Sequence, residues 1–342
     1  MANPVLTEAI DAVASGRDLD AGQASAVLRE IMEGNASEAE TAGFLVGLRA
    51  KGETVEEIVG LARTMRELAL PVEPVRDGLV DTAGTGGGAL TFNVSTTAAL
   101  VAATAGCAVA KHGNRSSTSQ SGSADVLEAL GARIDLEPDA VAACIDDVGF
   151  GFMFAPLHHP AMKHVVPVRK ALAVRTIFNF LGPLTNPAGA PHQVIGVSDP
   201  SYVDAMAAAL AGLGGRSALV VSSEDGLDEI SVSAPTRVVE VRDGRTVSFT
   251  VSPEDLGVEP APLGELGAGT PDHNAAITRR VLGGEGGGPR AVTLMNAGAA
   301  IYAAGRADTL AEGAAAAAEA IDSGAATELL ERFVARTQEL AP

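Results

Sequence analysis

With 342 residues and a formal net charge of −19, the chain is long enough for one large or two unequal domains. It is too acidic for general nucleic-acid or anionic-membrane binding, which depends on a basic face. No apolar run approaches the ~20 residues that span a bilayer, and the first residues lack the basic start of a signal peptide. Cys107 and Cys144 fit neither a metal motif nor a disulfide framework. We therefore expect a cytoplasmic protein without a membrane or nucleic-acid partner.

Residues 4–70 are predicted to form four helices. Apolar residues recur there three or four positions apart, which is the spacing of one helix face. Two capping boxes, at 37–40 and 54–57, each mark the start of a helix. The linker PVEP at 71–74 ends this block. We therefore expect residues 1–74 to form a small helical domain.

From residue 76 onward, predicted strands alternate with predicted helices. The strands are expected at 79–82, 107–110, 132–136, 150–154, 193–197 and 217–222, with helices at about 94–105, 124–130, 138–147 and 202–213. A hairpin turning at Asp243-Gly244 is expected within 236–251, and alanine-rich helices at 291–304 and 308–322. Such alternation is typical of a mostly parallel sheet with helices on its faces. The fold class is therefore α/β, and residues 75–342 form the large domain.

A glycine loop follows the first predicted strand, at Gly84-Thr-Gly86-Gly87-Gly88. Glycines let a ligand approach the backbone closely and leave N–H groups free, and the start of the next helix adds further unpaired N–H groups. Between residues 82 and 124 there is no Asp or Glu, although the protein as a whole is strongly acidic. The stretch is therefore predicted to bind an anionic small molecule at the carboxyl ends of the strands.

The spacing Gly84-x-Gly86-x-x-Ala89 also matches a dinucleotide fingerprint. That function requires an acidic residue at the end of the second strand, to hold ribose hydroxyls. Here the second strand ends in Lys111-His112, and no Walker lysine follows the glycine loop. A phosphate-binding loop of another kind is the better interpretation, ahead of a plain tight turn.

The segment from Lys111 to Ser119 supplies two cations, an imidazole, an amide and several hydroxyls directly after a buried strand. Arginine offers two parallel donors to phosphate oxygens and lysine a point charge, so this segment is predicted to bind phosphate. Ser123 lies at the start of the next helix, where it fits a phosphate contact or an N-cap.

A second stretch without acidic residues runs from Val148 to Ser198 and contains Arg169 beside apolar and aromatic residues. A cation in such surroundings suits a planar substrate that carries a carboxylate. The stretch also holds four histidines; structural roles are expected for His158, His164 and His192.

Asp228 and Glu229 follow the predicted strand at 217–222. Adjacent carboxylates at a strand end form a site for a hard cation, and Mg²⁺ is the natural ion beside phosphates. The alternative is a solvated acidic turn, which the glycine loop makes less favourable.

Taken together, these motifs resemble the anthranilate phosphoribosyltransferases of tryptophan biosynthesis over nearly the whole chain. The resemblance rests on GTGG with TFNVST, KHGNRS with SGSADVLEALG, FAPLHHPAMKHVVPVRK with VRTIFNFLGPLTNPAG, and GLDEIS. It implies the fold of nucleoside phosphorylases and phosphoribosyltransferases, with helices from about 165–190 joining the small domain, and a homodimer formed through the helices. The implied enzyme joins anthranilate to phosphoribosyl pyrophosphate, with Mg²⁺ as cofactor, and releases pyrophosphate.

The resemblance also implies site residues. Contacts to phosphoribosyl pyrophosphate are expected from Gly84, Gly86, Gly87, Gly88, Thr91, Asn93, Val94, Ser95, Thr96, Lys111, His112, Gly113, Asn114, Arg115, Ser116, Ser117, Thr118, Ser119 and Ser123. Contacts to anthranilate are expected from Gly84, Asn114, His159 and Arg169, and metal ligands from Ser95, Asp228 and Glu229. Lys111, His112 and Arg169 are the expected catalytic residues, with His112 at most a proton acceptor.

Gly88 departs from the family pattern, which usually has an acidic residue after GTGG. A carboxylate there could hold Mg²⁺ on the diphosphate, so a Gly88→Asp variant is expected to have a different Mg²⁺ optimum. Two other functions fit the sequence less well: a pyrimidine nucleoside phosphorylase, disfavoured by KHGNRS and PLTNP, and a non-catalytic nucleic-acid-binding relative, disfavoured by the net charge and by Asp228-Glu229.

Overall fold

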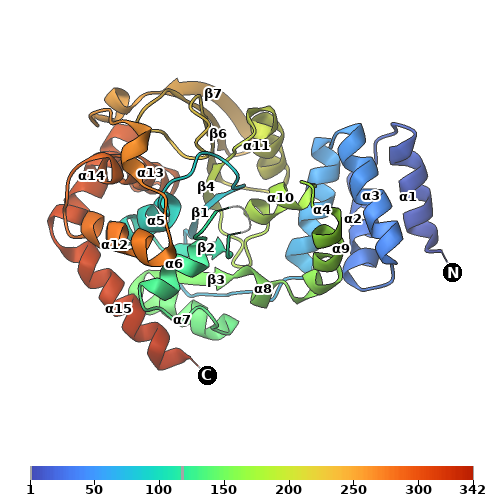
Figure 1. Cartoon of the computed structure of the whole chain (residues 1–342), viewed down its shortest axis with the longest axis horizontal. Coiled ribbons are helices and arrows are strands. Elements are labelled where there is room, and N and C mark those ends of the chain that lie inside the picture. The colour runs from blue at the N-terminus through green and yellow to red at the C-terminus, as the bar shows by residue number, and fades with distance from the viewer. Residues whose placement is uncertain (1, 117–118, 342) are drawn as a thin grey trace.

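The computed structural model describes residues 2–116 and 119–341. Its first part is the helical bundle that the capping boxes predict. The bundle consists of α1 (Pro4–Ala14), α2 (Ala21–Met32), α3 (Glu38–Lys51) and α4 (Val55–Glu67). Ser37 and Thr54 cap α3 and α4 with reciprocal bonds to Glu40 and Glu57, as expected. Figure 1 shows this bundle at one end of the molecule, beside the α/β part.

A seven-stranded sheet in the order β3-β2-β1-β4-β5-β6-β7 forms the centre of the α/β part. Its strands are β1 (Val80–Gly84), β2 (Val109–Gly113), β3 (Phe150–Phe154), β4 (His192–Gly196), β5 (Ser217–Ser223), β6 (Thr236–Arg242) and β7 (Arg245–Val251). The first five pair in parallel and the last two are antiparallel. The order reverses between β1 and β4, which is where ligands bind in open α/β sheets. The predicted α/β fold with a mostly parallel sheet is confirmed.

Helices cover both faces of the sheet. They are α5 (Val94–Thr104), α6 (Ser123–Ala129), α7 (Pro138–Val148), α8 (Ala155–His158), α9 (Val166–Leu172), α10 (Phe178–Leu181), α11 (Val203–Gly212), α12 (Pro271–Leu282), α13 (Gly288–Ala303), α14 (Leu310–Asp322) and α15 (Ala325–Leu340). Figure 1 places α12 to α15 on the side of the sheet away from the helical bundle. No helix within the described residues has the length and the apolar character needed to cross a membrane.

The strand predicted at 132–136 is wrong. Residues 132–137 form neither helix nor strand, yet Ile134 and Leu136 are almost fully buried. The apolar alternation is real, but it reflects packing against neighbouring helices rather than a strand ladder. The predicted hairpin is confirmed: β6 and β7 pair with Arg242 opposite Arg245, and Asp243 and Gly244 both have positive φ, as a two-residue turn requires.

Two hydrophobic cores lie on opposite faces of the sheet, because alternate strand residues point to opposite sides. On β5, Leu219 and Val221 join the core formed with α5 and α13, whereas Ala218 and Val220 join the core shared with the helical bundle. The second core also contains residues of α9 and α10, among them Val168 and Phe178. The division of the chain at about residue 74, with 165–190 joining the helical part, stays a prediction.

Candidate active site

The two predicted phosphate-binding loops begin side by side. β1 and β2 pair in parallel with Val80 beside Val109, and β1 pairs with β4 so that Gly84 lies beside Gly196. The carboxyl ends of all three strands therefore meet at one edge of the sheet. Because β5 also pairs in parallel with β4, the glycine loop, the loop after β2 and the turn after β5 all lie at this edge of the sheet.

The glycine loop folds against the acidic turn that follows β5. The N–H of Gly86 donates to Asp228 Oδ2 at 3.0 Å, and the N–H of Ala89 donates to the carbonyl of Gly226 at 3.0 Å. Gly86 and Gly87 have φ of 65° and 83°, in the left-handed region that favours glycine. The glycine loop and the acidic turn, which are far apart in the sequence, are thus joined by hydrogen bonds.

Gly196 makes this close approach possible, and sequence reasoning did not identify it. A Cβ atom at this position would lie 1.6 Å from the carbonyl oxygen of Asp228, which is backbone and cannot turn aside. A glycine at the end of a buried strand, beside the first glycine loop in the sheet, is the signal that could have revealed it.

We predict that Gly196→Ala destabilises the protein by about 1–3 kcal/mol, because the acidic turn must move to make room for the methyl group. Gly264→Ala is the matched control, since a Cβ atom there meets nothing within 4 Å and its φ is not positive. Urea unfolding followed by circular dichroism measures both variants. Equal stability of the two would contradict the close packing.

Lys111 is buried at the end of β2, with 1% of its surface exposed. Its Nζ atom donates to the carbonyl of Thr82, to Thr82 Oγ1 at 3.1 Å and to Ser95 Oγ at 3.4 Å. Burial lowers the pKa of Lys111, while the charges of Asp81 and Glu229 act in the opposite direction. The three donors of the ammonium group are engaged by the protein, so its predicted contact with a phosphate stays a prediction.

Asp81 is a site residue that sequence reasoning passed over. It is fully buried on β1; its Oδ1 accepts from the backbone N–H of His112 at 3.1 Å and its Oδ2 from the side-chain amide of Asn186 at 2.8 Å. Burial raises its pKa to about 6, and the charge of Lys111 partly offsets this. The signal available in the sequence was a carboxylate placed within an apolar strand.

The predicted metal ligands lie together. Burial and repulsion by Asp228 raise the pKa of Glu229, while Lys111 and the backbone N–H of Ser95 lower it. Burial also raises the pKa of Asp228. A divalent cation would relieve the cost of two neighbouring half-buried charges, so the donor set fits Mg²⁺. Among the described residues no cluster of three or more His, Cys, Asp or Glu could hold a metal, so other ligands would come from hydroxyls, water or a bound phosphate.

The surroundings of Gly88 alter the expectation for Gly88→Asp. A Cβ atom at this position would lie 2.8 Å from both the carbonyl oxygen of Gly226 and Oδ1 of Asp228. The substitution would therefore displace the acidic turn as well as add a carboxylate. A changed Mg²⁺ optimum in that variant could not be assigned to the new carboxylate alone.

Two histidines meet beside the end of β2. The ring centroids of His112 and His159 are 5.1 Å apart, and His112 Nδ1 lies 3.2 Å from the carbonyl of Gly182. His112 Nε2 is buried and has no hydrogen-bond partner in the described part of the chain. Burial lowers the pKa of both rings, to about 4 for His159, so both are neutral at pH 7. His158 is arranged in the same way: its Nδ1 lies 3.2 Å from the carbonyl of Phe154, and its Nε2 is buried without a partner among the described residues, so its expected structural role stays a prediction.

These histidines predict a loss of stability in acid. The pKa of His159 falls from 6.5 to about 4 on folding, so between these pH values the unfolded chain binds a proton that the folded protein does not. The stability that the neutral His159 ring contributes to the folded protein is fully present above pH 6.5. It is lost as the pH falls toward 4, which lowers the free energy of unfolding by up to about 3 kcal/mol. Urea unfolding of the wild type at pH 7.5 and pH 5 should show this loss, and His159→Gln should show less of it. An identical pH dependence in the variant would refute this assignment.

Arg169 lies half-buried on α9, with its guanidinium carbon 5.7 Å from the centre of the Phe178 ring. Burial lowers its pKa, and no carboxylate among the described residues lies within ion-pair distance. Such a cation is costly unless an anion pairs with it. Its position therefore suits an anionic group of a ligand, and its aromatic neighbour suits a planar one.

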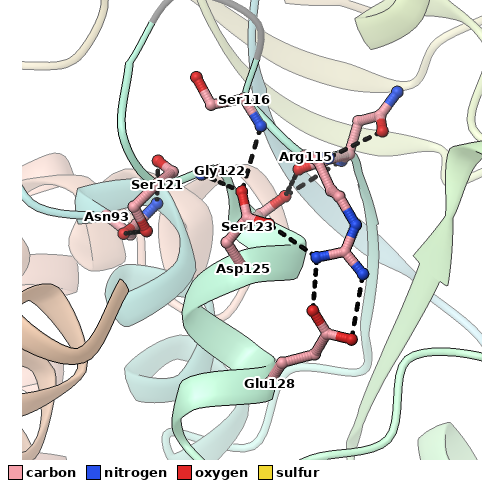
Figure 2. A network of polar contacts seen from close by, with 9 residues as sticks. Asn93, Arg115, Ser116, Ser121, Gly122, Ser123, Asp125 and Glu128 are labelled. Atoms are coloured by element: carbon pink, nitrogen blue, oxygen red, sulfur yellow. Dashed lines mark hydrogen bonds and ion pairs between the residues drawn. The ribbon is translucent and has the colours of Figure 1, made fainter. Parts of the chain in front are cut away.

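The loop after β2 is tied to the start of α5 and α6. Asn93 donates to the carbonyl of Ser121 at 3.1 Å and accepts from the Ser121 hydroxyl at 2.9 Å (Figure 2). Ser123 Oγ accepts from the N–H of Asn114 at 3.2 Å. The guanidinium group of Arg115, in contrast, binds Asp125 and Glu128 of α6, so its expected contact with a phosphate stays a prediction.

Arg175 also belongs to the site, although the sequence indicated only that it lies in a stretch without acids. Its Nη2 atom donates to the carbonyl of Gly86 and to Ser198 Oγ, both at 3.2 Å. Arg49 of α3 in turn donates to the carbonyl of Arg175. Arg175 thereby links the glycine loop to the helical bundle.

The remaining predicted residues lie as follows. Gly84 ends β1; Gly86, Gly87, Gly88 and Thr91 lie between β1 and α5; Val94, Ser95 and Thr96 begin α5; Lys111, His112 and Gly113 end β2; Asn114, Arg115, Ser116 and Ser119 lie between β2 and α6; Ser123 begins α6. Ser117 and Thr118 lie outside the described residues. Thr96 Oγ1 is buried without a partner among the residues described. The loops and the acidic turn lie at the same edge of the sheet, whereas Arg169 lies on the separate helix α9.

Comparison with known proteins identifies the family. Residues 76–327 match the a/b domain of a glycosyl transferase family, and residues 7–69 match the helical bundle domain of a glycosyl transferase family. The anthranilate phosphoribosyltransferase of Symbiobacterium thermophilum is 54% identical over 329 residues, which cover 96% of each chain. That of Rubrobacter xylanophilus is 54% identical over 340 residues, covering 98% of this chain and 99% of the relative.

Solved structures agree. The crystal structure of anthranilate phosphoribosyltransferase from Thermus thermophilus is similar with a TM-score of 0.92 and 47% identity, covering 96% of this chain and 99% of the other. The Saccharomyces cerevisiae enzyme in complex with PRPP and Mg is similar with a TM-score of 0.89 and 28% identity, covering 99% of both chains. The chain therefore belongs to the anthranilate phosphoribosyltransferase family.

Proposed function

We propose that this enzyme transfers the phosphoribosyl group of phosphoribosyl pyrophosphate to the amine of anthranilate, giving N-(5-phosphoribosyl)anthranilate and pyrophosphate in tryptophan biosynthesis. The observation that carries the proposal is the arrangement at the sheet edge: two loops rich in donors meet a pair of carboxylates, Asp228 and Glu229. Phosphate oxygens suit the loops and a hard cation suits the carboxylates.

Phosphoribosyl pyrophosphate would bind across the ends of β1 and β2. The glycine loop offers backbone N–H groups without side chains to block them, and the first residues of α5 add the positive end of a helix. Contacts are proposed for Gly84, Gly86, Gly87, Gly88, Thr91, Asn93 to Thr96, Lys111 to Gly113, Asn114, Ser116, Ser117, Thr118, Ser119 and Ser123.

Mg²⁺ is the proposed cofactor, held by Ser95, Asp228 and Glu229. When bound, it would neutralise charge on the diphosphate. Lys111 contacts Ser95, and its positive charge acts on Glu229, so it would reduce the repulsion between these carboxylates and the phosphorylated substrate. The Saccharomyces cerevisiae relative solved in complex with PRPP and Mg supports Mg²⁺ as the cofactor.

Anthranilate would bind beside Arg169, which can hold its carboxylate, with Gly84, Asn114 and His159 as further contacts. The amine nitrogen attacks the anomeric carbon with its lone pair and forms the new C–N bond. At the same time the bond from that carbon to the pyrophosphate oxygen breaks, and the electron pair of the broken bond leaves with pyrophosphate. The amine then loses a proton, for which the neutral His112 offers Nε2. Because an aromatic amine is already nucleophilic, most of the catalytic effect would come from holding both reactants in line and stabilising the leaving group.

We also propose that the enzyme is a cytoplasmic homodimer that associates through the helical domain. Exposed apolar side chains support such an interface: Val46 on α3 is 45% exposed and Val174, after α9, is 50% exposed. Light scattering of the wild type and of Val46→Glu tests it. A monomeric wild type would contradict it.

Anthranilate fluorescence gives the direct test of the function. Purified protein with phosphoribosyl pyrophosphate and Mg²⁺ should deplete the fluorescence of anthranilate, and leaving out any one component should stop the reaction. Depletion that does not need phosphoribosyl pyrophosphate, or no depletion at all, would refute the proposal. Phosphorolysis of thymidine would instead indicate a pyrimidine nucleoside phosphorylase.

A further inference from the structure

Arg115 makes contacts that its sequence context does not suggest. It lies between two proposed phosphate contacts, Asn114 and Ser116, yet its guanidinium group is directed at α6. Nη1 donates to Asp125 Oδ1 at 2.7 Å and also to Glu128, and Nη2 donates to Glu128 Oε1 at 3.1 Å (Figure 2). The guanidinium carbon lies 5.5 Å from the centre of the Phe154 ring.

Asp125 joins this ion pair to the loop itself. Its Oδ2 accepts from the N–H of Gly122 at 2.8 Å and from the N–H of Ser116 at 3.3 Å. One carboxylate thus holds both ends of the segment between Ser116 and Gly122, while its other oxygen is fixed by Arg115 (Figure 2). Asp125 is the most buried member of the group, with 18% of its side chain exposed.

The charge of the group also argues against a direct phosphate contact. One arginine and two carboxylates carry a net charge of −1, so the guanidinium offers no free positive charge to an anion. A phosphate that bound Arg115 would have to displace two carboxylates and then lie beside them. Coulomb repulsion at a partly exposed site makes that arrangement unfavourable.

We propose that Arg115 is a positioning residue: through Asp125 and Glu128 it fixes Asn114, Ser116 and Ser123 for binding of the phosphorylated substrate, and it makes no contact with that substrate. The proposal rests on the proposed function, since it assigns the loop to phosphoribosyl pyrophosphate. It adds Asp125 and Glu128, neither of which touches the substrate, to the residues on which substrate binding depends.

A double-mutant cycle separates positioning from direct contact. In the positioning account Arg115→Ala and Glu128→Gln each raise the KM for phosphoribosyl pyrophosphate roughly 3- to 10-fold, and the double variant is no worse than Arg115→Ala alone. The KM for anthranilate at saturating phosphoribosyl pyrophosphate rises less, because Asn114 is the only one of the positioned residues that is also a proposed anthranilate contact. A direct contact predicts instead that Glu128→Gln leaves the KM unchanged or lowers it, because it frees the cation. That result would overturn the proposal.

Arg133→Ala is the matched control. Arg133 pairs with Asp135 through two bonds, its side chain is 41% exposed against 48% for Arg115, and it lies outside the loop. Its KM for phosphoribosyl pyrophosphate should equal that of the wild type. An increase matching that of Arg115→Ala would show that any lost surface ion pair has this effect, and would overturn the proposal.

Hydrogen exchange tests the positioning without using activity. The amides of Ser116 and Gly122 should exchange faster in both Arg115→Ala and Glu128→Gln, and at the wild-type rate in Arg133→Ala. Unchanged exchange in the first two variants would overturn the proposal. If the wild type proved inactive with anthranilate, the proposed function would fail while the exchange result still showed whether the ion pair holds the loop.

Discussion

Replacing Glu229 with glutamine, or Asp228 with asparagine, should lower kcat/KM for phosphoribosyl pyrophosphate by at least about 100-fold. Both carboxylates lie in the turn after β5, where the N–H of Gly86 in the glycine loop donates to Asp228. Burial raises the pKa of both, and repulsion by Asp228 raises that of Glu229 further. Removing one charge removes the attraction for Mg²⁺ that the pair supplies. Either variant should therefore need more Mg²⁺ to reach half-maximal rate.

The control for this pair lies in the same turn. Glu224 is exposed and four residues before Asp228, so Glu224→Gln removes a similar charge without touching the site. Its Mg²⁺ dependence should match the wild type. Initial rates measured across a Mg²⁺ titration compare the variants, and calorimetry measures the binding of Mg²⁺ directly. Normal Mg²⁺ binding by Glu229→Gln would show that the metal lies elsewhere.

Arg169→Ala should raise the KM for anthranilate about 10- to 100-fold, with little change in the KM for phosphoribosyl pyrophosphate. A hydrogen bond to a charged group contributes about 1.5–3 kcal/mol, and each 1.4 kcal/mol is a factor of ten. The half-buried guanidinium has no carboxylate partner in the described parts of the chain, so an anthranilate carboxylate would supply the missing charge.

Lys170→Ala gives the comparison for Arg169→Ala, because Lys170 is the exposed neighbouring cation on the same helix. It should leave both KM values unchanged. Arg169→Lys should recover only part of the affinity, since an ammonium group cannot form two parallel bonds to a carboxylate. Equal effects of the alanine variants on the two substrates would indicate a general electrostatic role and not an anthranilate contact.

Much of the site could be predicted because local sequence determines it. Glycines with positive φ, the hydroxyl and amide residues at the start of α5 and the charged residues after β2 are all read within a few positions of a strand end. The parallel pairing of β1 and β2 then brings these segments together without further information. The pair Asp228-Glu229 also follows a predicted strand, which is why the sequence already indicated a cation site there beside the phosphate-binding loops.

The residues that escaped prediction depend on tertiary contacts. Gly196 is needed because the carbonyl of Asp228 packs against it from another segment, and Asp81 acts on the backbone of His112 from the neighbouring strand. The sequence also shows the charge of Arg115 but not the carboxylates that pair with it, and this pairing is the basis of our proposal that Arg115 positions the loop. The apolar pattern at 132–136 failed for the same reason: burial alone does not distinguish a strand from a packed loop.

A crystal structure with phosphoribosyl pyrophosphate and Mg²⁺ is the most direct test of where the reaction takes place. We expect the diphosphate between the glycine loop at 84–88 and the loop that begins at Lys111, with the metal ion on Asp228 and Glu229. Phosphoribosyl pyrophosphate bound away from the ends of β1 and β2, or a metal ion that contacts neither carboxylate, would contradict this account of the site.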